Sequence, residues 1–113
     1  MKLKAKVTRV LDGDTVDVII GFPFGISVEK RVRLFGINTP ETRTKDPIEK
    51  AKGYAARDRL DELLREGGYR VTLVYHGDGK FGRPLGELYI EDKNLNEILV
   101  SEGHAIPYFG GKR

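Results

Sequence analysis

Short segments with the signature of β-strands dominate the sequence, and this pattern constrains the fold more than any other feature. Five such segments lie at residues 3–10, 15–20, 28–35, 71–75 and 85–90. The first and third alternate with the two-residue period of a strand, and the second is rich in β-branched residues. In the third segment Val28, Val32 and Leu34 fall on one face, while Arg31 and Arg33 fall on the other.

Two segments have the period of a helix instead. The first is expected at Tyr54–Glu66, ends at Gly67, and has an apolar stripe formed by Ala56, Leu60, Leu63 and Leu64. The second is expected to begin at a cap formed by Asn94. Residues 37–52 read as a long loop. The order βββ-α-ββ-α predicts an α+β fold, a five-stranded OB-fold β-barrel with helices packed against it.

Size and composition restrict the classes that remain. The 113 residues fit a single domain, 1–113, and the absence of cysteine excludes disulfides and thiolate zinc sites. A formal net charge of +3 permits an anionic partner such as nucleic acid without requiring one. No apolar stretch is long enough to span a bilayer, and the basic start lacks the apolar run of a signal peptide. We therefore expect a soluble monomer without membrane contact, cytoplasmic unless a precursor segment has been removed.

Three polar clusters could carry chemistry, although each has an ordinary structural interpretation. Asp12-Gly13-Asp14-Thr15 is typical of a hairpin turn, but Asp14 could also bind a hard cation such as Ca²⁺. The segment from Arg33 to Glu41 ends a strand and enters a proline-containing turn. Phe81-Gly82-Arg83 is typical of a hairpin tip with a surface arginine.

Together the clusters supply the parts needed to hydrolyse a phosphodiester. That reaction needs positive charge at the phosphoryl oxygens, and arginine can donate to two of them at once. It also needs a base or a polarised water. Asp14 and Glu41 supply two acids, and Arg33 and Arg83 supply two guanidinium groups. The combination predicts a metal-dependent phosphodiesterase.

The chain resembles the staphylococcal nuclease family from about Val7 to Tyr108. Three stretches carry the resemblance, in matching order and spacing: Val10–Val16 (VLDGDTV), Arg33–Thr42 (RLFGINTPET) and Lys80–Arg83 (KFGR). The resemblance implies an OB-fold barrel with helices and calcium-assisted cleavage of DNA or RNA.

The resemblance also implies a metal site. Asp14 matches a calcium ligand, and Thr39 matches the residue whose backbone carbonyl binds the ion. Asn38 stands where the family has a second ligating aspartate. Asparagine offers an oxygen without a charge, so calcium affinity and ion choice depart from the family pattern here.

The remaining site residues follow from the same resemblance. Glu41 matches the acid that activates or orients the attacking water. Arg33 and Arg83 match the two arginines that hold and stabilise the phosphate. Phe81, in the third motif, and Tyr108, which matches an aromatic residue of the nucleotide pocket, are expected to bind substrate.

Two other functions fit the sequence. One is a non-catalytic OB-fold module that binds nucleic acid, and the other is a protein-interaction module in which the Asp-rich turns are purely structural. Retention of both acids and both arginines favours the enzyme. The last residues, 110–113, read as a tail, whereas the secreted member of the family continues into a C-terminal helix.

Overall fold

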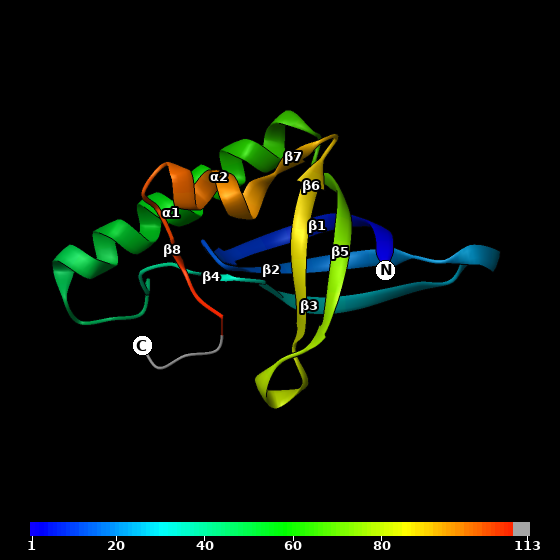
Figure 1. Ribbon diagram of the computed structural model, residues 1–113, viewed down its shortest axis with the longest axis horizontal. Helices are drawn as coiled ribbons and strands as arrows, with labels where there is room; N and C mark the ends of the chain where they lie inside the picture. Colours follow the sequence, from blue (N-terminus) through cyan, green and yellow to red (C-terminus); the bar gives the residue numbers. More distant parts are fainter. Residues whose placement is uncertain (110–113) are drawn as a thin grey trace.

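The computed structural model describes residues 1–109, and the expected tail at 110–113 lies outside them. In chain order the elements are β1 (Lys2–Asp12), β2 (Thr15–Gly21), β3 (Ser27–Leu34), β4 (Ile37–Asn38), α1 (Pro47–Glu66), β5 (Arg70–Asp78), β6 (Pro84–Ile90), β7 (Lys93–Asn94), α2 (Leu95–Ser101) and β8 (Ile106–Pro107). Five strands lie in the order β3-β2-β1-β5-β6, and a parallel pairing between β3 and β6 closes them into a barrel (Figure 1). The predicted five-stranded barrel with helices is confirmed.

The core fills the barrel and extends beneath the helices. Its largest fully buried side chains are Val16, Val18, Val32, Leu34, Leu73 and Leu88 from the strands, and Leu60, Leu64, Leu95 and Leu99 from the helices. Inward residues recur at every second position because successive side chains of a strand point to opposite faces. Both helices lie on the same side of the barrel in Figure 1. No helix within residues 1–109 is long and apolar enough to cross a membrane.

Helix α1 begins seven residues earlier than predicted. The Asp46 side chain caps it by accepting from the N–H of Ile48 at 2.9 Å, and Pro47 occupies its first turn. Residues 37–52 are therefore not one long loop. The early turns escaped prediction because they are exposed, with Ile48 at 69% exposure, and so carry no apolar stripe. The predicted cap of α2 is confirmed, since the Asn94 side chain accepts from the N–H of Glu97.

The β2–β3 and β5–β6 hairpins end in the same kind of turn. Each turn places a phenylalanine, Phe24 or Phe81, in the left-handed region at φ 66° and 61°, followed by a glycine with positive φ. In each, the N–H two residues before the phenylalanine donates to the carbonyl two residues after it, at 2.8 and 2.7 Å. Both rings are almost fully exposed, at 98% and 97%. The two tips project from the barrel in different directions (Figure 1).

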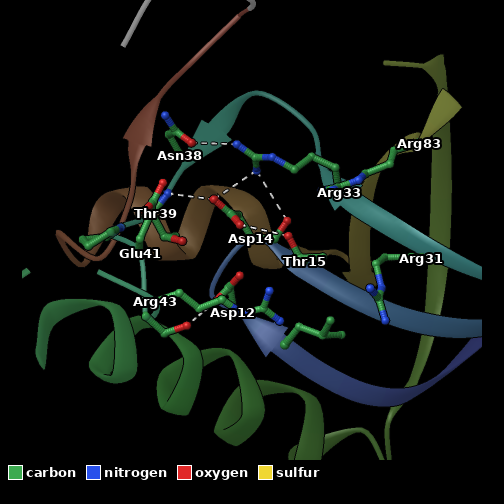
Figure 2. Close-up of a pocket in the computed structure, with 13 residues that line it drawn as sticks. Asp12, Asp14, Thr15, Arg31, Arg33, Asn38, Thr39, Glu41, Arg43 and Arg83 are labelled. Carbon is green, nitrogen blue, oxygen red and sulfur yellow. Dashed lines mark hydrogen bonds and ion pairs between the residues drawn. The ribbon is translucent and has the colours of Figure 1, made fainter. Parts of the chain in front are cut away.

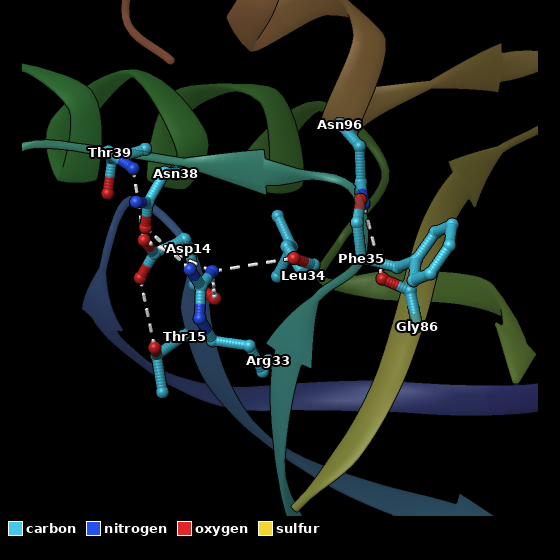
Figure 3. A network of polar contacts seen from close by, with 9 residues as sticks. All are labelled: Asp14, Thr15, Arg33, Leu34, Phe35, Asn38, Thr39, Gly86 and Asn96. Carbon is cyan, nitrogen blue, oxygen red and sulfur yellow. Dashed lines mark hydrogen bonds and ion pairs between the residues drawn. The ribbon is translucent and has the colours of Figure 1, made fainter. Parts of the chain in front are cut away.

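Asn96 connects α2 to the barrel closure. Its side chain is buried, donates to the carbonyls of Phe35 at 2.9 Å and Gly86 at 3.2 Å, and accepts from the N–H of Leu88 at 3.2 Å (Figure 3). Phe35 directly follows β3, whereas Gly86 and Leu88 belong to β6. One side chain thus satisfies backbone groups on both strands of the parallel pair.

Replacing Asn96 should destabilise the barrel strongly. Asn96→Ala removes the side-chain partner of the Phe35 carbonyl and of the Leu88 N–H, whereas the Gly86 carbonyl keeps the N–H of Phe35. Each buried group left without a partner costs roughly 1–3 kcal/mol. We expect the free energy of unfolding to fall by about 2–4 kcal/mol in urea denaturation. The exposed neighbour substitution Glu97→Gln should change it by less than about 0.5 kcal/mol. Equal effects of the two substitutions would mean that Asn96 does not hold the closure.

Candidate functional site

A pocket of about 320 Å³ opens where the β1–β2 turn, the end of β3, the segment after β4 and the start of β6 meet (Figure 2). Six of the residues predicted from sequence line it: Asp14, Arg33, Asn38, Thr39, Glu41 and Arg83. They come from three separate stretches of the chain, at residue 14, at residues 33–41 and at residue 83. The fold thus brings the metal, acid and arginine candidates together, while their roles stay predictions.

Asp14 is the centre of the polar network. It is only 8% exposed and sits at the tight turn between β1 and β2. Its Oδ2 accepts from the backbone N–H of Thr39 at 3.0 Å, and its Oδ1 accepts from the hydroxyl of Thr15 at 3.1 Å. Arg33 approaches the same Oδ2 at 3.1 Å. These contacts give the buried carboxylate the ion pair and the hydrogen bonds that burial of such a group requires.

Arg33 bridges the carboxylate of Asp14 and the amide of Asn38. One terminal nitrogen contacts Asp14, and the other donates to Asn38 Oδ1 at 2.7 Å (Figure 3). The planar guanidinium is therefore held in a fixed orientation at the pocket wall. In this structure the Asn38 oxygen orients an arginine, a contact that the sequence did not suggest.

Helix α1 presses against the segment that carries Glu41. A Cβ at Gly53 would lie 2.6 Å from the Glu41 carbonyl oxygen and 2.9 Å from that of Pro40. A Cβ at Gly13 would similarly lie 2.8 Å from the Cβ of Ala56. Both positions require glycine, because a side chain there would clash. The helix can therefore pack directly against the backbone of the segment from which Glu41 projects toward the pocket. An isolated glycine inside a helical pattern was the signal that sequence reasoning passed over.

The pocket holds four arginines rather than the two predicted. Arg31 and Arg43 line it together with Arg33 and Arg83. Arg31 is fixed by Asp17, with Nε to Oδ1 at 2.8 Å and a second contact at 3.2 Å. That hydrogen-bonded pairing lowers the pKa of Asp17 and raises the pKa of Arg31, so both stay charged around neutral pH. The strand alternation that puts Arg31 beside Arg33 could have identified it.

Two predicted substrate-binding residues lie outside the pocket wall. Phe81 projects into solvent from its hairpin tip, two residues before Arg83. Tyr108 is half-buried, and its backbone N–H donates to the carbonyl of Gly36 at 2.8 Å. Neither is among the residues that line the pocket, so their contact with substrate stays a prediction.

The candidate donor atoms for a metal ion in this pocket are oxygens, which suit a hard cation. Asp14, Asn38, Thr39 and Glu41 offer oxygen only, which is the ligand type that Ca²⁺ takes. Among residues 1–109 there is no group of three or more histidine, cysteine, aspartate or glutamate side chains placed to hold a metal. Asp14 is the most buried carboxylate of the pocket lining, and its Oδ2 is already in contact with Arg33. These oxygens are of the type that a hard cation such as Ca²⁺ takes.

Comparison with known proteins agrees with this barrel and pocket. Residues 31–113 match the profile of the staphylococcal nuclease homologues. The chain is 32% identical over 107 residues to an uncharacterized endonuclease of Escherichia coli O157:H7, covering 94% of this chain and 61% of that protein. It is 32% identical over 99 residues to endonuclease YncB of Bacillus subtilis, covering 86% and 44%. It is 31% identical over 99 residues to a thermonuclease of Staphylococcus intermedius, covering 88% and 56%.

The chain belongs to the staphylococcal nuclease family. It spans between 44% and 61% of the length of these three relatives.

The close approach at Gly53 gives a test of how α1 supports the site. In an exposed helix, alanine is more stable than glycine by about 1 kcal/mol. Because the new methyl group would meet backbone at 2.6 Å, Gly53→Ala should instead lower the free energy of unfolding by about 1–3 kcal/mol. Ala55→Gly, on the exposed side of the helix, should lower the free energy of unfolding by about 1 kcal/mol. This control measures the difference in helix propensity between alanine and glycine without the clash. Stabilisation by Gly53→Ala would contradict the packing described.

Proposed function

We propose that this protein is a calcium-dependent nuclease that hydrolyses phosphodiester bonds of DNA or RNA. The observation that carries the proposal is the convergence of Asp14, Arg33, Glu41 and Arg83 on one pocket of a staphylococcal nuclease barrel. Relatives that bear the names endonuclease and thermonuclease support hydrolysis over simple binding.

Each side chain has a role that follows from its place. Arg33 and Arg83 donate to the phosphoryl oxygens, where negative charge builds in the transition state. Glu41 is exposed at the pocket mouth, where it can accept a proton from the attacking water. Arg33 is already oriented by Asp14 and Asn38, so little reorganisation is needed when the phosphate arrives.

A divalent ion would be held by Asp14, with the Thr39 carbonyl and the Asn38 amide oxygen as neutral ligands. Bound Ca²⁺ supplies positive charge beside the phosphate. The buried, hydrogen-bonded carboxylate of Asp14 supports this assignment, because it provides a fixed negative charge at the pocket floor.

Cleavage assays separate the nuclease from a non-catalytic OB-fold module. Plasmid and single-stranded DNA are incubated with the protein in Ca²⁺ or in EGTA. We expect cleavage in Ca²⁺ and its loss in EGTA. Binding without cleavage under any divalent ion would assign the chain to the module instead.

Arg83 should matter mainly in the transition state. Removing one donor to developing negative charge typically lowers kcat by a factor on the order of 10² or more. Arg83→Ala should therefore lower kcat more than it raises KM in steady-state cleavage assays. Arg65→Ala, an exposed arginine of α1 that does not line the pocket, serves as the control of equal charge. A near-parental kcat for Arg83→Ala would remove Arg83 from the mechanism.

Asn38 sets the calcium affinity if it contacts the ion. With Asp14 as the main carboxylate, binding to the free protein should be weak, about millimolar. Asn38→Asp adds a charge and should tighten Ca²⁺ binding roughly tenfold in calorimetric titration. Because Arg33 donates to Asn38 Oδ1, the new carboxylate also pairs with Arg33, which limits the gain. Equal affinities of parent and variant would exclude position 38 from the metal site.

A further inference from the structure

Three lysines form a regular row on the outside of the barrel. Lys2, Lys4 and Lys6 alternate along β1 with Leu3 and Ala5, which face the core. Successive side chains of a strand point to opposite faces, so the three ammonium groups lie on one face, roughly 7 Å apart along the strand. All three are exposed, and none forms a salt bridge within residues 1–109.

A β-bulge continues the row toward the pocket. Val7 pairs with Val18 and Arg9 pairs with Asp17, which leaves Thr8 as an extra residue of β1. Without the bulge, strict alternation would turn Arg9 toward the core. Instead Arg9 is exposed beside Asp17 on the outer face.

The row reaches the pocket through β2 and β3. Asp17 of β2 pairs on its other side with Arg31 of β3, and Arg31 lines both the site pocket and an adjoining hollow on the sheet surface. Arg9 and Arg31 therefore flank Asp17 in one cross-strand row, and Arg33 follows two residues along β3. The cations thus run from Lys2 along β1 to Arg9, and beyond Asp17 they continue with Arg31 at the pocket wall.

Acidic side chains on this face do not cancel the positive charge. Asp17 is engaged by Arg31 through two contacts. Glu29 of β3 pairs with Ile19 of β2, which pairs in turn with Lys6 of β1. Glu29 and Lys6 are therefore two strands apart. On β5, Lys6 is paired with a further cation, Arg70. Glu87 of β6 lies in the row that runs through Val74 to Lys2, and its carboxylate contacts His76 and Asn94. These acids lie on other strands, and every charged residue of β1 from Lys2 to Arg9 is a cation.

We propose that Lys2, Lys4, Lys6, Arg9 and Arg31 form a track that binds the backbone of a single-stranded polynucleotide and leads it to the pocket. The inference rests on the nuclease function proposed above and specifies its substrate as a long single strand. A single file of cations on one β-strand matches one sugar-phosphate backbone. Positively charged grooves that follow a backbone are how OB-folds bind single strands, with about 4–16 nucleotides per fold.

Salt-dependent binding measures how many of these cations meet phosphates. For single strands, log K falls with log salt concentration with a slope of about −0.7 per neutralised phosphate. Fluorescence anisotropy with labelled single-stranded DNA of about 16 nucleotides, in EDTA to prevent cleavage, gives that slope between about 50 and 200 mM salt. The variant is Lys2→Gln, Lys4→Gln, Lys6→Gln. We expect its slope to be smaller by about 2 and its affinity at low salt to be roughly tenfold weaker or more.

Two matched variants control for charge and folding. Lys45, Lys50 and Lys52 are exposed near the start of α1, and replacing them with glutamine also lowers the formal net charge from +3 to zero. That variant should keep the parental slope. Replacing Lys2, Lys4 and Lys6 with arginine should also keep it, because the charges remain. Equal losses in the two glutamine variants, or an unchanged slope in the β1 variant, would overturn the track.

Other ligands define further outcomes. Equal or tighter binding of a duplex of the same length, with equal sensitivity to the β1 lysines, would overturn the single-strand assignment. Loss of binding to anionic phospholipid vesicles, with oligonucleotide binding unchanged, would make the face a membrane contact instead.

Cleavage assays of the same variants distinguish a failure of the proposed track from a failure of the proposed nuclease activity. If no variant cleaves DNA but the β1 variant alone loses salt-dependent binding, the track stands and the catalytic proposal fails. If Ca²⁺-dependent cleavage is present while the β1 variant binds oligonucleotide as the parent does, catalysis stands and the track fails.

Discussion

The buried carboxylate of Asp14 is the interaction on which the pocket depends. It lies at the start of β2, ion-paired with Arg33 at the end of β3 and hydrogen-bonded to the backbone of Thr39 just after β4. Burying a charge is costly unless it is paired and hydrogen-bonded, and here both conditions are met. Removing any of these partners would leave the buried Asp14 carboxylate without its ion pair or without one of its hydrogen bonds. The same contacts therefore join three segments of the barrel and hold an anion at the floor of a polar pocket.

Helix α1 gives that network a rigid support. Its glycine at position 53 lets the helix backbone approach the carbonyl of Glu41, and Ala56 packs against Gly13 in the β1–β2 turn. Small residues at these contacts let the helix pack closely against both the turn and the segment after β4. A site whose geometry must be held within about half an ångström benefits from such packing. The helix thus supports the site through packing contacts, although its residues do not line the pocket.

Sequence reasoning recovered the elements from local patterns, and it recovered the barrel from their order and from the family resemblance. The alternation of β3 and the Asn94 cap were predicted because each is encoded by neighbouring residues. The contacts that hold the closure between β3 and β6 have no local signal, because the two strands are distant in the chain and Asn96 reaches them from a separate helix. Arg31 was passed over as a site residue although its alternation with Arg33 places both on one face, whereas its pairing with Asp17 across the strands has no local signal. The early turns of α1 were missed because exposed helix has no apolar stripe.

Because charge is sorted in space, a net charge of only +3 understates how positive the row of cations on β1 is. Much of the acidic content lies on or beside α1 and is matched there by arginine, as in the pairs Asp61–Arg65 and Glu102–Arg59. Paired charges of that kind contribute little to the field over the outer face of β1, because screening limits the range of exposed charges to about 10 Å. The lysines of β1 have no such partners among residues 1–109. Overall composition averages the paired and the unpaired charges, whereas the fold separates them, and this separation is what the proposed track requires.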